Sequence, residues 1–120
     1  MGHGVVDEAI ALLEIAEVEG VLRENPSLFT PGERAYAESK PDPWRRLAAR
    51  LAAKRAAAGL LGVPPSSIEI VRGRGGPPRL VLAPDALQAL RTRGATTTRV
   101  SLTHGETHAA AVVLLLRESD

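Results

Sequence analysis

The sequence contains no cysteine, has only 2% aromatic residues and lacks a long apolar run. The absence of cysteine excludes a disulfide framework, a thiolate nucleophile and a zinc knuckle. The lack of disulfides also fits a cytoplasmic protein. The low aromatic content removes the stacking platforms that hold nucleic-acid bases. The longest apolar run, residues 109–116, is too short to cross a bilayer. With a net charge of +1, we expect a cytoplasmic protein without a nucleic-acid or membrane partner.

Residues 47–62 are the part of the chain that most strongly favours a helix. Almost all of them are Ala, Leu, Arg or Lys, which have high helix propensity. We expect this helix to begin at Pro43, with Asp42 as its cap, and to end at Gly62. Its length and composition make it the element around which the rest of the chain would be arranged.

Two faces of this helix carry different chemistry. The apolar stripe is expected to consist of Trp44, Leu47, Leu51, Ala58 and Leu61. Arg46, Arg50 and Lys54 lie four residues apart on another face, which predicts a cationic ridge beside the buried stripe. Arg55 lies at the edge of the stripe, given the angular spacing of an α-helix.

The remaining elements lie on both sides of this helix in the sequence. In order, they are a strand at about residues 6–12, helices at about 14–23 and 31–39, strands at 68–71 and 80–82 that form a hairpin, a helix at 85–93, and strands at 97–103 and 108–117. The apolar residues of 5–22 fit both a strand and a helix. The junction between the first strand and the first helix therefore stays open. The apolar last strand predicts burial on both faces. Together these patterns predict one α+β domain, residues 1–120, with an antiparallel sheet and a long helix across it.

Five blocks of the sequence resemble a known family. They are LLEIAEVE, FTPGERAY, LAARLAAKRAAAGLLG, SSIEIVRGRGGPPRLVL and RVSLTHGETHAAAVVLL. In this order they resemble the holo-acyl-carrier-protein synthases, the small 4′-phosphopantetheinyl transferases, from about Ala9 to the end. The resemblance implies a homotrimer with clefts between protomers. It also implies that Mg²⁺-bound coenzyme A lies in each cleft and passes its phosphopantetheine arm to a carrier-protein serine.

Four positions depart from the family's pattern. The metal-binding Asp that precedes the family's V-E-I is here Ala11, and the second carboxylate, in A-A-K-E-A, is here Arg55. A lysine near the phosphates is replaced by Gly59, and an arginine that docks the acidic carrier protein is replaced by Glu17. The positions that retain the pattern are Arg50, Lys54, Ser101, Thr103 and His104.

The departures at positions 11 and 55 remove the expected metal site. Mg²⁺ needs hard oxygen ligands, usually at least one or two carboxylates. Ala11 has no side-chain oxygen, and the Arg55 guanidinium repels a cation while binding phosphate well. We therefore expect no metal ligand and no cofactor, although a coenzyme A or pantetheine-linked ligand stays possible. Asp7 or Glu8 would replace the missing ligand only if the first strand slipped in register.

We expect the cleft to be reused for a small anionic or thioester-linked biosynthetic intermediate. The expected ligand-binding residues are Arg50, Lys54, Arg55, Ser101 and Thr103. His104 is the expected acid–base residue, because histidine ordinarily titrates near neutrality, with Glu14 or Glu106 as its partner. Such a protein would be a metal-independent cyclase, isomerase or lyase.

Two other functions stay open, one catalytic and one not. The first is an active phosphopantetheinyl transferase, in which Arg55 supplies the charge of the metal. The second is a non-catalytic pseudoenzyme subunit that binds a partner, with docking of a carrier protein weakened by Glu17.

Several of these residues also have purely structural explanations. Arg50 and Lys54 would suit a solvated helix face, and Arg55 would extend its stem over the core. Glu33 fits a helix-capping residue, as the sequence Thr30-Pro31-Gly32-Glu33 is a capping box. The RGRGG segment fits a hairpin turn better than an RNA-binding box, because the aromatics are absent.

Overall fold

The computed structural model describes residues 3–118 and is built from five strands, four α-helices and three short 3₁₀ segments over that range. In order, the elements are β1 (His3–Glu14), η1 (Ile15–Glu17), α1 (Val18–Glu24), η2 (Pro26–Leu28), α2 (Pro31–Glu38), α3 (Pro43–Leu61), η3 (Pro65–Ser67), β2 (Ile68–Arg72), β3 (Pro78–Leu82), α4 (Pro84–Thr92), β4 (Thr97–His104) and β5 (His108–Glu118). The predicted single domain of residues 1–120 includes two residues at each end that lie outside this range, and its extent stays a prediction.

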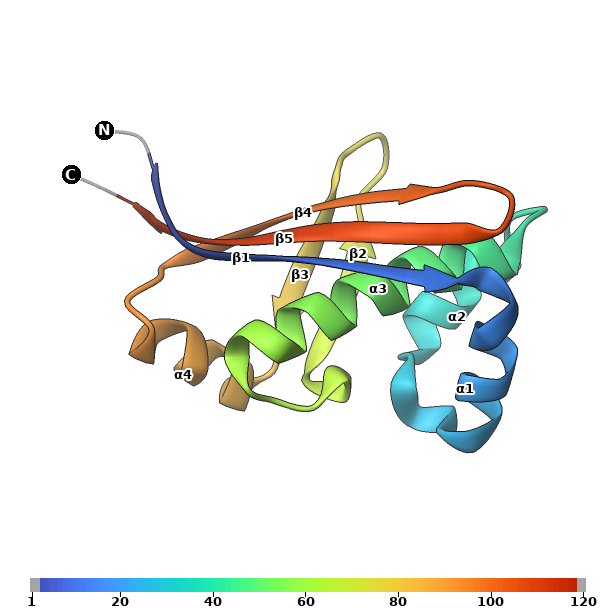
Figure 1. Ribbon diagram of the computed structural model, residues 1–120, viewed down its shortest axis with the longest axis horizontal. Helices are drawn as coiled ribbons and strands as arrows, with labels where there is room; N and C mark the ends of the chain where they lie inside the picture. Colours follow the sequence, from blue (N-terminus) through green and yellow to red (C-terminus); the bar gives the residue numbers. More distant parts are fainter. Residues whose placement is uncertain (1–2, 119–120) are drawn as a thin grey trace.

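The main sheet has the strand order β1-β5-β4, and both pairs are antiparallel. Helix α3 lies along one face of this sheet, with α1 and α2 at one end and α4 at the other (Figure 1). Strands β2 and β3 form a separate antiparallel hairpin that runs across the direction of the main sheet. The predicted α+β fold, with a long helix across an antiparallel sheet, is therefore confirmed, and the hairpin forms a second sheet.

Small side chains form the contact between α3 and the sheet. On α3, the buried alanines include Ala48, Ala49, Ala52, Ala53, Ala56 and Ala57. Strand β5, which α3 contacts, also has small residues at its inward positions Ala109 and Ala111. Small groups on both surfaces let the helix approach the sheet closely and keep the interior densely packed. Larger side chains, such as Leu51 and Leu115, fill the rest of the core.

The ends of α3 largely follow the prediction. Pro43 occupies the first turn, and Gly62 ends the helix in the left-handed conformation at φ 69°. Asp42 precedes the helix, but its carboxylate makes no capping hydrogen bond and instead accepts one from Arg46 Nε at 3.1 Å. Trp44 is 39% exposed. The prediction of Trp44 in the buried stripe was wrong, because no element of the described chain covers its side chain there.

Strand β5 is buried on one face only, which corrects the prediction of burial on both. Its side chains alternate, and Ala109, Ala111 and Val113 point into the core. On the opposite face, which we call the outer face of the sheet, no element of the described chain covers Ile10 and Val112. The apolar run in the sequence therefore reflects two surfaces, one packed and one open.

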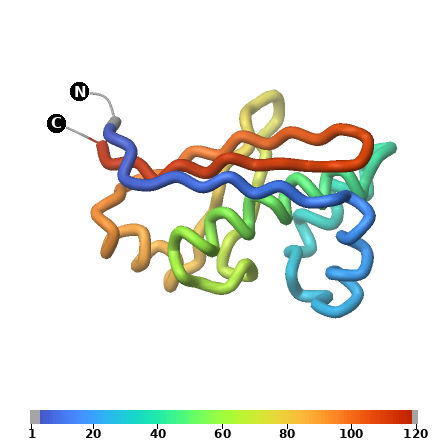
Figure 2. Tube along the Cα trace, in the orientation of Figure 1, coloured from blue at the N-terminus to red at the C-terminus, as the bar shows by residue number. Residues whose placement is uncertain are grey.

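The chain near the N-terminus resolves the open junction. Strand β1 extends to Glu14, beyond the predicted end at residue 12, and a 3₁₀ turn leads into α1. The capping box predicted at Thr30 is present, with Glu33 N donating to Thr30 Oγ1 at 3.1 Å. The path of the chain through these turns can be followed in Figure 2. Of the helices in residues 3–118, none combines the length and apolar character needed to cross a membrane.

Candidate functional site

The centre of α3 carries a buried ion pair. Lys54 Nζ lies 2.6 Å from Glu33 Oε1, and both side chains have no exposed surface. Lys54 Nζ also donates to the Leu28 carbonyl at 2.8 Å, and Glu33 Oε2 accepts from Ile70 N at 2.9 Å. This pair ties α2 and the β2–β3 hairpin to α3. The predicted cationic ridge is therefore wrong at Lys54, because its charge is neutralised inside the protein.

Arg50, one turn before Lys54, is also buried, with 3% of its surface exposed. Its guanidinium carbon lies 4.3 Å from the centroid of the Tyr36 ring, a cation–π geometry. One terminal nitrogen donates to the Ile70 carbonyl at 3.4 Å, while Nε has no partner. Burial lowers the pKa of Arg50 from its ordinary value, and the nearby Glu33 carboxylate opposes that shift. The guanidinium stays charged, as arginine does in proteins.

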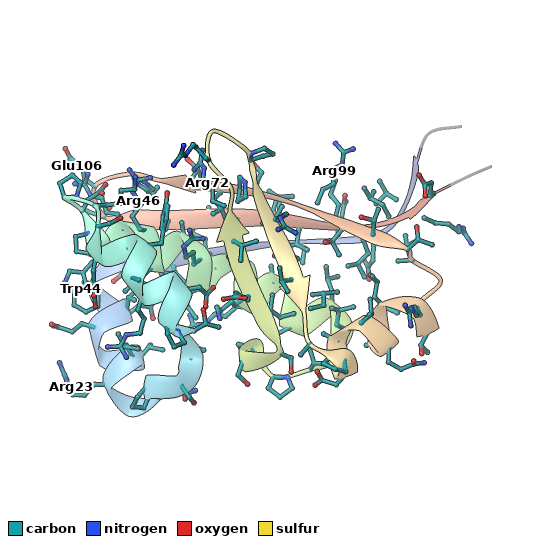
Figure 3. The ribbon with its side chains drawn as sticks, turned by 180° about the vertical axis from the view of Figure 1, so that it is seen from behind. Arg23, Trp44, Arg46, Arg72, Arg99 and Glu106 are labelled. Atoms are coloured by element: carbon teal, nitrogen blue, oxygen red, sulfur yellow. The ribbon has the colours of Figure 1, made fainter. Side chains whose placement is uncertain are left out.

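A cavity of about 260 Å³ opens beside Arg50, and we call it the arginine pocket. Its cationic groups are Arg46 and Arg50 from α3 and Arg72 from the end of β2, and the imidazole of His104 from the end of β4 also lines it. Figure 3 shows Arg46 and Arg72 at the same end of the molecule, beside the hairpin turn. Three guanidiniums around one cavity favour a phosphate or a carboxylate, because the planar fork binds such groups bidentately.

Two buried polar atoms at this pocket, Arg50 Nε and His104 Nδ1, have no hydrogen-bond partner among residues 3–118. Buried polar atoms are nearly always satisfied in proteins, and exceptions call for an explanation. A ligand with acceptor oxygens would satisfy Arg50 Nε. His104 Nδ1 would serve as a donor or an acceptor, depending on its tautomer.

Within residues 3–118, one carboxylate forms an ion pair with an arginine of the arginine pocket. Asp42 Oδ1 lies 3.1 Å from Arg46 Nε, and the two side chains are 24% and 30% exposed. The hydrogen bond from Arg46 lowers the pKa of Asp42 below its ordinary value, with smaller effects from charge. Arg46 is thus held by Asp42 at the mouth of the pocket.

A second, shallower cavity of about 490 Å³ lies at the other edge of the sheet. We call it the β1-edge pocket, and it is lined among others by Asp7, Ala11, Arg55, Gly59 and Arg93. Arg93 donates to Asp7 Oδ2 at 3.2 Å. The structure thus brings together Ala11 and Arg55, although they are far apart in sequence.

The two carboxylates predicted to partner His104 lie elsewhere. Glu14 and Glu106 line a third cavity, of about 550 Å³, together with His108. Within residues 3–118, His104 has no hydrogen bond to either carboxylate, and Glu14 instead forms the capping box of η1 with Glu17. Ser101 is exposed on the outer face of the sheet, whereas Thr103 lines the arginine pocket. The five predicted ligand-binding residues are thus divided among four places.

Sequence reasoning missed two polar residues of the arginine pocket, Tyr36 and Arg72. Tyr36 lies within the FTPGERAY block, whose interpretation stopped at the capping box. Arg72 begins the RGRGG segment, which was interpreted only as a turn. The return of the hairpin beside α3 could not be foreseen from spacing alone, since it depends on tertiary packing.

A scan against models of protein families finds no match to this chain. A search of characterised proteins finds relatives over most of the chain. The holo-[acyl-carrier-protein] synthase of Moorella thermoacetica is 38% identical over 120 aligned residues, covering 92% of this chain and 94% of that protein.

Solved structures of the same kind share the fold. The Helicobacter pylori holo-[acyl-carrier-protein] synthase in complex with coenzyme A matches with a TM-score of 0.75 at 18% identity, covering 91% of this chain and 99% of that one. The Bacillus anthracis holo-(acyl-carrier-protein) synthase in complex with CoA (3′,5′-ADP) matches with a TM-score of 0.74 at 22% identity, covering 95% and 98%. At these identities, the likeness concerns the fold.

The Mg²⁺ that the resemblance implies does not fit the donor atoms of this chain. The two positions expected to hold it, Ala11 and Arg55, lie in one pocket. Ala11 has no side-chain oxygen, and Arg55 carries a positive charge that repels a cation. Asp7, a possible substitute, is engaged by Arg93. In the part of the chain that the structure describes, no three His, Cys, Asp or Glu side chains are grouped as a metal site would require.

Proposed function

This chain belongs to the holo-acyl-carrier-protein synthase family, and from that premise we propose that it binds coenzyme A or a related small anionic or thioester-linked intermediate without Mg²⁺-dependent phosphopantetheinyl transfer. The observation that carries this proposal is the arginine pocket, with its unpartnered Arg50 Nε and His104 Nδ1. Coenzyme A carries a 3′-phosphate that such a pocket suits. The coenzyme A and 3′,5′-ADP bound in the Helicobacter and Bacillus structures support the same ligand class.

The proposed chemistry is acid–base chemistry at His104. Histidine is the usual group for proton transfer near neutrality. For a thioester-linked intermediate that enters this pocket by its acyl end, the guanidiniums would stabilise the enolate formed when His104 takes a proton from the carbon next to the thioester carbonyl. Proton transfer, cyclisation and elimination need no metal. This agrees with Ala11 and Arg55, whose side chains offer no ligand to a metal ion.

We propose a homotrimer that uses the outer face of the main sheet. Ile10, Leu12 and Val112 are 75%, 68% and 36% exposed there, as a continuous apolar surface on paired strands. Surfaces of this kind mark interaction sites. Light scattering should give the mass of three chains. The double variant Ile10→Glu with Leu12→Glu should be monomeric, whereas Val81→Glu, at an exposed position on the hairpin, should not. A monomeric wild-type protein would contradict the assembly.

Calorimetric titration tests the ligand. Wild-type protein in EDTA should bind coenzyme A and 3′,5′-ADP, and should bind dephospho-coenzyme A at least about tenfold more weakly, since a charged hydrogen-bonded contact contributes about 1.5–3 kcal/mol. Arg72→Gln should weaken binding of coenzyme A and 3′,5′-ADP by a similar factor. The matched control is Arg79→Gln, an exposed arginine on the same hairpin, outside the arginine pocket. Equal affinities for coenzyme A and dephospho-coenzyme A would contradict the proposed pocket.

The acid–base role is tested by isotope exchange. Acetyl-coenzyme A in D₂O should exchange the protons next to its thioester carbonyl faster with the protein than without it. His104→Ala should remove this acceleration and leave the oligomeric state unchanged. Absence of exchange with wild-type protein, despite measured binding, would restrict the function to binding.

The second candidate is an active phosphopantetheinyl transferase, which the name of the relative at 38% identity favours. Its carrier protein would meet Glu17, an exposed carboxylate, where the family's pattern has an arginine, and like charges disfavour an acidic partner. Intact-mass measurement of a carrier protein incubated with this chain, coenzyme A and Mg²⁺ decides the matter. A mass gain of one phosphopantetheine would overturn the metal-free proposal.

A further inference from the structure

Arg55 is the exposed cation of the β1-edge pocket that the described chain leaves without a partner. It follows Lys54 directly, yet no hydrogen bond or ion pair within residues 3–118 engages its guanidinium. The other arginine of this pocket, Arg93, is paired with Asp7 at 3.2 Å. A free guanidinium in a cavity is a strong site for a phosphate, because its donors form a rigid fork.

The carboxylates that line this pocket form no ion pair with Arg55 in the described residues. Asp7 is already neutralised by Arg93. Glu8 also lines the pocket, but no ion pair within residues 3–118 joins its carboxylate to Arg55. The guanidinium of Arg55 is thus unpaired beside Ala11, whose methyl group offers neither charge nor hydrogen bond.

We propose that Arg55 binds the diphosphate of a coenzyme A-type ligand directly, so that this site works as a metal-free diphosphate site. The inference rests on the proposed function, since it concerns the same ligand. A pair of carboxylates with Mg²⁺ has a summed charge of zero, whereas Ala11 with Arg55 has a charge of +1. The two substitutions therefore leave these positions one charge unit more positive than a metal-bound carboxylate pair, and this charge can attract a diphosphate without a metal. If only the Asp at position 11 were replaced, the family's carboxylate at position 55 would remain and would repel a phosphate.

The space around Arg55 allows such a ligand to approach. Gly59 lies one turn further along α3, and a Cβ at that position would meet no atom within 4 Å. The arginine pocket lies at the β4 edge of the sheet, whereas this pocket lies at the β1 edge. In the proposed trimer, one ligand would reach the arginine pocket of one copy and Arg55 of the next.

The experiment compares coenzyme A with 3′,5′-ADP, which has a single phosphate at its 5′ position and no diphosphate. In EDTA, Arg55→Gln should weaken binding of coenzyme A by about 10- to 100-fold, the usual loss for a charged hydrogen-bonded pair. Binding of 3′,5′-ADP should stay unchanged. Arg91→Gln, an exposed arginine outside the β1-edge pocket, is the control and should change neither affinity.

A second variant asks whether a metal can be put back. Ala11→Asp combined with Arg55→Glu should bind coenzyme A at least about tenfold more tightly in Mg²⁺ than in EDTA, because two carboxylates recreate oxygen ligands. Wild-type affinity should be the same in both. Wild-type binding that requires Mg²⁺, or an Arg55→Gln variant with unchanged affinity for coenzyme A, would overturn the proposal. Failure of the proposed function is distinct, because wild-type protein would then bind neither coenzyme A nor 3′,5′-ADP.

Discussion

The cationic side chains in the two halves of α3 differ in burial and in their surroundings. In its first half, Arg50 is buried beside Tyr36 and lines a narrow cavity with Arg46. In its second half, Arg55 is exposed in a shallow pocket. The first half holds its charges in fixed positions through packing and hydrogen bonds. In the second half, Arg55 carries an exposed charge with open space beside it.

The sharpest contrast lies between two adjacent residues. Lys54 has no exposed surface and is neutralised by Glu33, while Arg55 is exposed and unneutralised. A helix turns by about 100° per residue, so one position faces α2 while the next faces the edge of the sheet. The difference teaches that a basic helix composition does not define a basic surface, since each charge depends on what the fold places opposite it.

The largest expected effect is the difference in the free energy of unfolding between variants at Lys54 and at Arg55. Lys54→Ala should lower the free energy of unfolding by about 3–5 kcal/mol, because it leaves the Glu33 carboxylate buried without a counter-charge. Arg55→Ala should change it by less than about 0.5 kcal/mol. Urea denaturation followed by circular dichroism measures both. Similar losses for the two variants would show that the buried pair is not special.

The next effect concerns the shape of the Arg50 side chain. Arg50→Lys keeps the charge but loses the planar fork and its stacking on Tyr36. Binding of 3′,5′-ADP should weaken by about tenfold, or about 1.4 kcal/mol. Arg55→Lys should leave 3′,5′-ADP binding unchanged in the same calorimetric titration. An unaffected Arg50→Lys variant would mean that charge alone decides binding at this end of α3.

A smaller effect is expected from glycine at the second end of the helix. Gly59→Ala should raise the free energy of unfolding by about 0.5–1 kcal/mol, because it reduces the backbone entropy of the unfolded chain and the added Cβ meets no atom. Gly62→Ala should lower it by about 1 kcal/mol, since Gly62 has a φ of 69°. Thermal denaturation of the two variants distinguishes these signs. Destabilisation by Gly59→Ala would point to an unseen contact at the β1-edge pocket.

The smallest effect is the pH dependence of the Asp42–Arg46 pair. The pKa of Asp42 in the folded protein is lowered below 3.8 by the hydrogen bond from Arg46. Its stabilising contribution is therefore fully present above that value and is lost as the pH falls through the folded-state pKa. Asp42→Asn should lower the melting temperature slightly at neutral pH and not at about pH 2. The same difference at both pH values would contradict an ionic contribution.

The elements of the fold could be predicted because their signals are local. Proline at the first turn and glycine at the end placed α3, and Thr30 with Glu33 placed α2. The errors at Trp44, Lys54 and β5 share one cause. Periodicity shows that a helix or strand has two faces, but it does not show which other element covers each face.

The candidate site depended on the fold to a greater degree. The sequence pointed to Arg50, Thr103 and His104, and the structure gathers them in the arginine pocket. Tyr36 and Arg72 joined them only because α2 and the β2–β3 hairpin pack beside α3. Glu14 and Glu106, expected near His104, lie with His108 in a different cavity.

The sequence by itself determined the family, the α+β class and the loss of carboxylates at positions 11 and 55, since these follow from residue identity and short-range pattern. The tertiary structure decided which charges are free. It buried Lys54 against Glu33, and it placed Arg55 opposite Ala11 with room for a ligand. The physical reason is that the effect of a charge depends on its solvation and its neighbours within a few ångströms, and most of those neighbours come from distant parts of the chain.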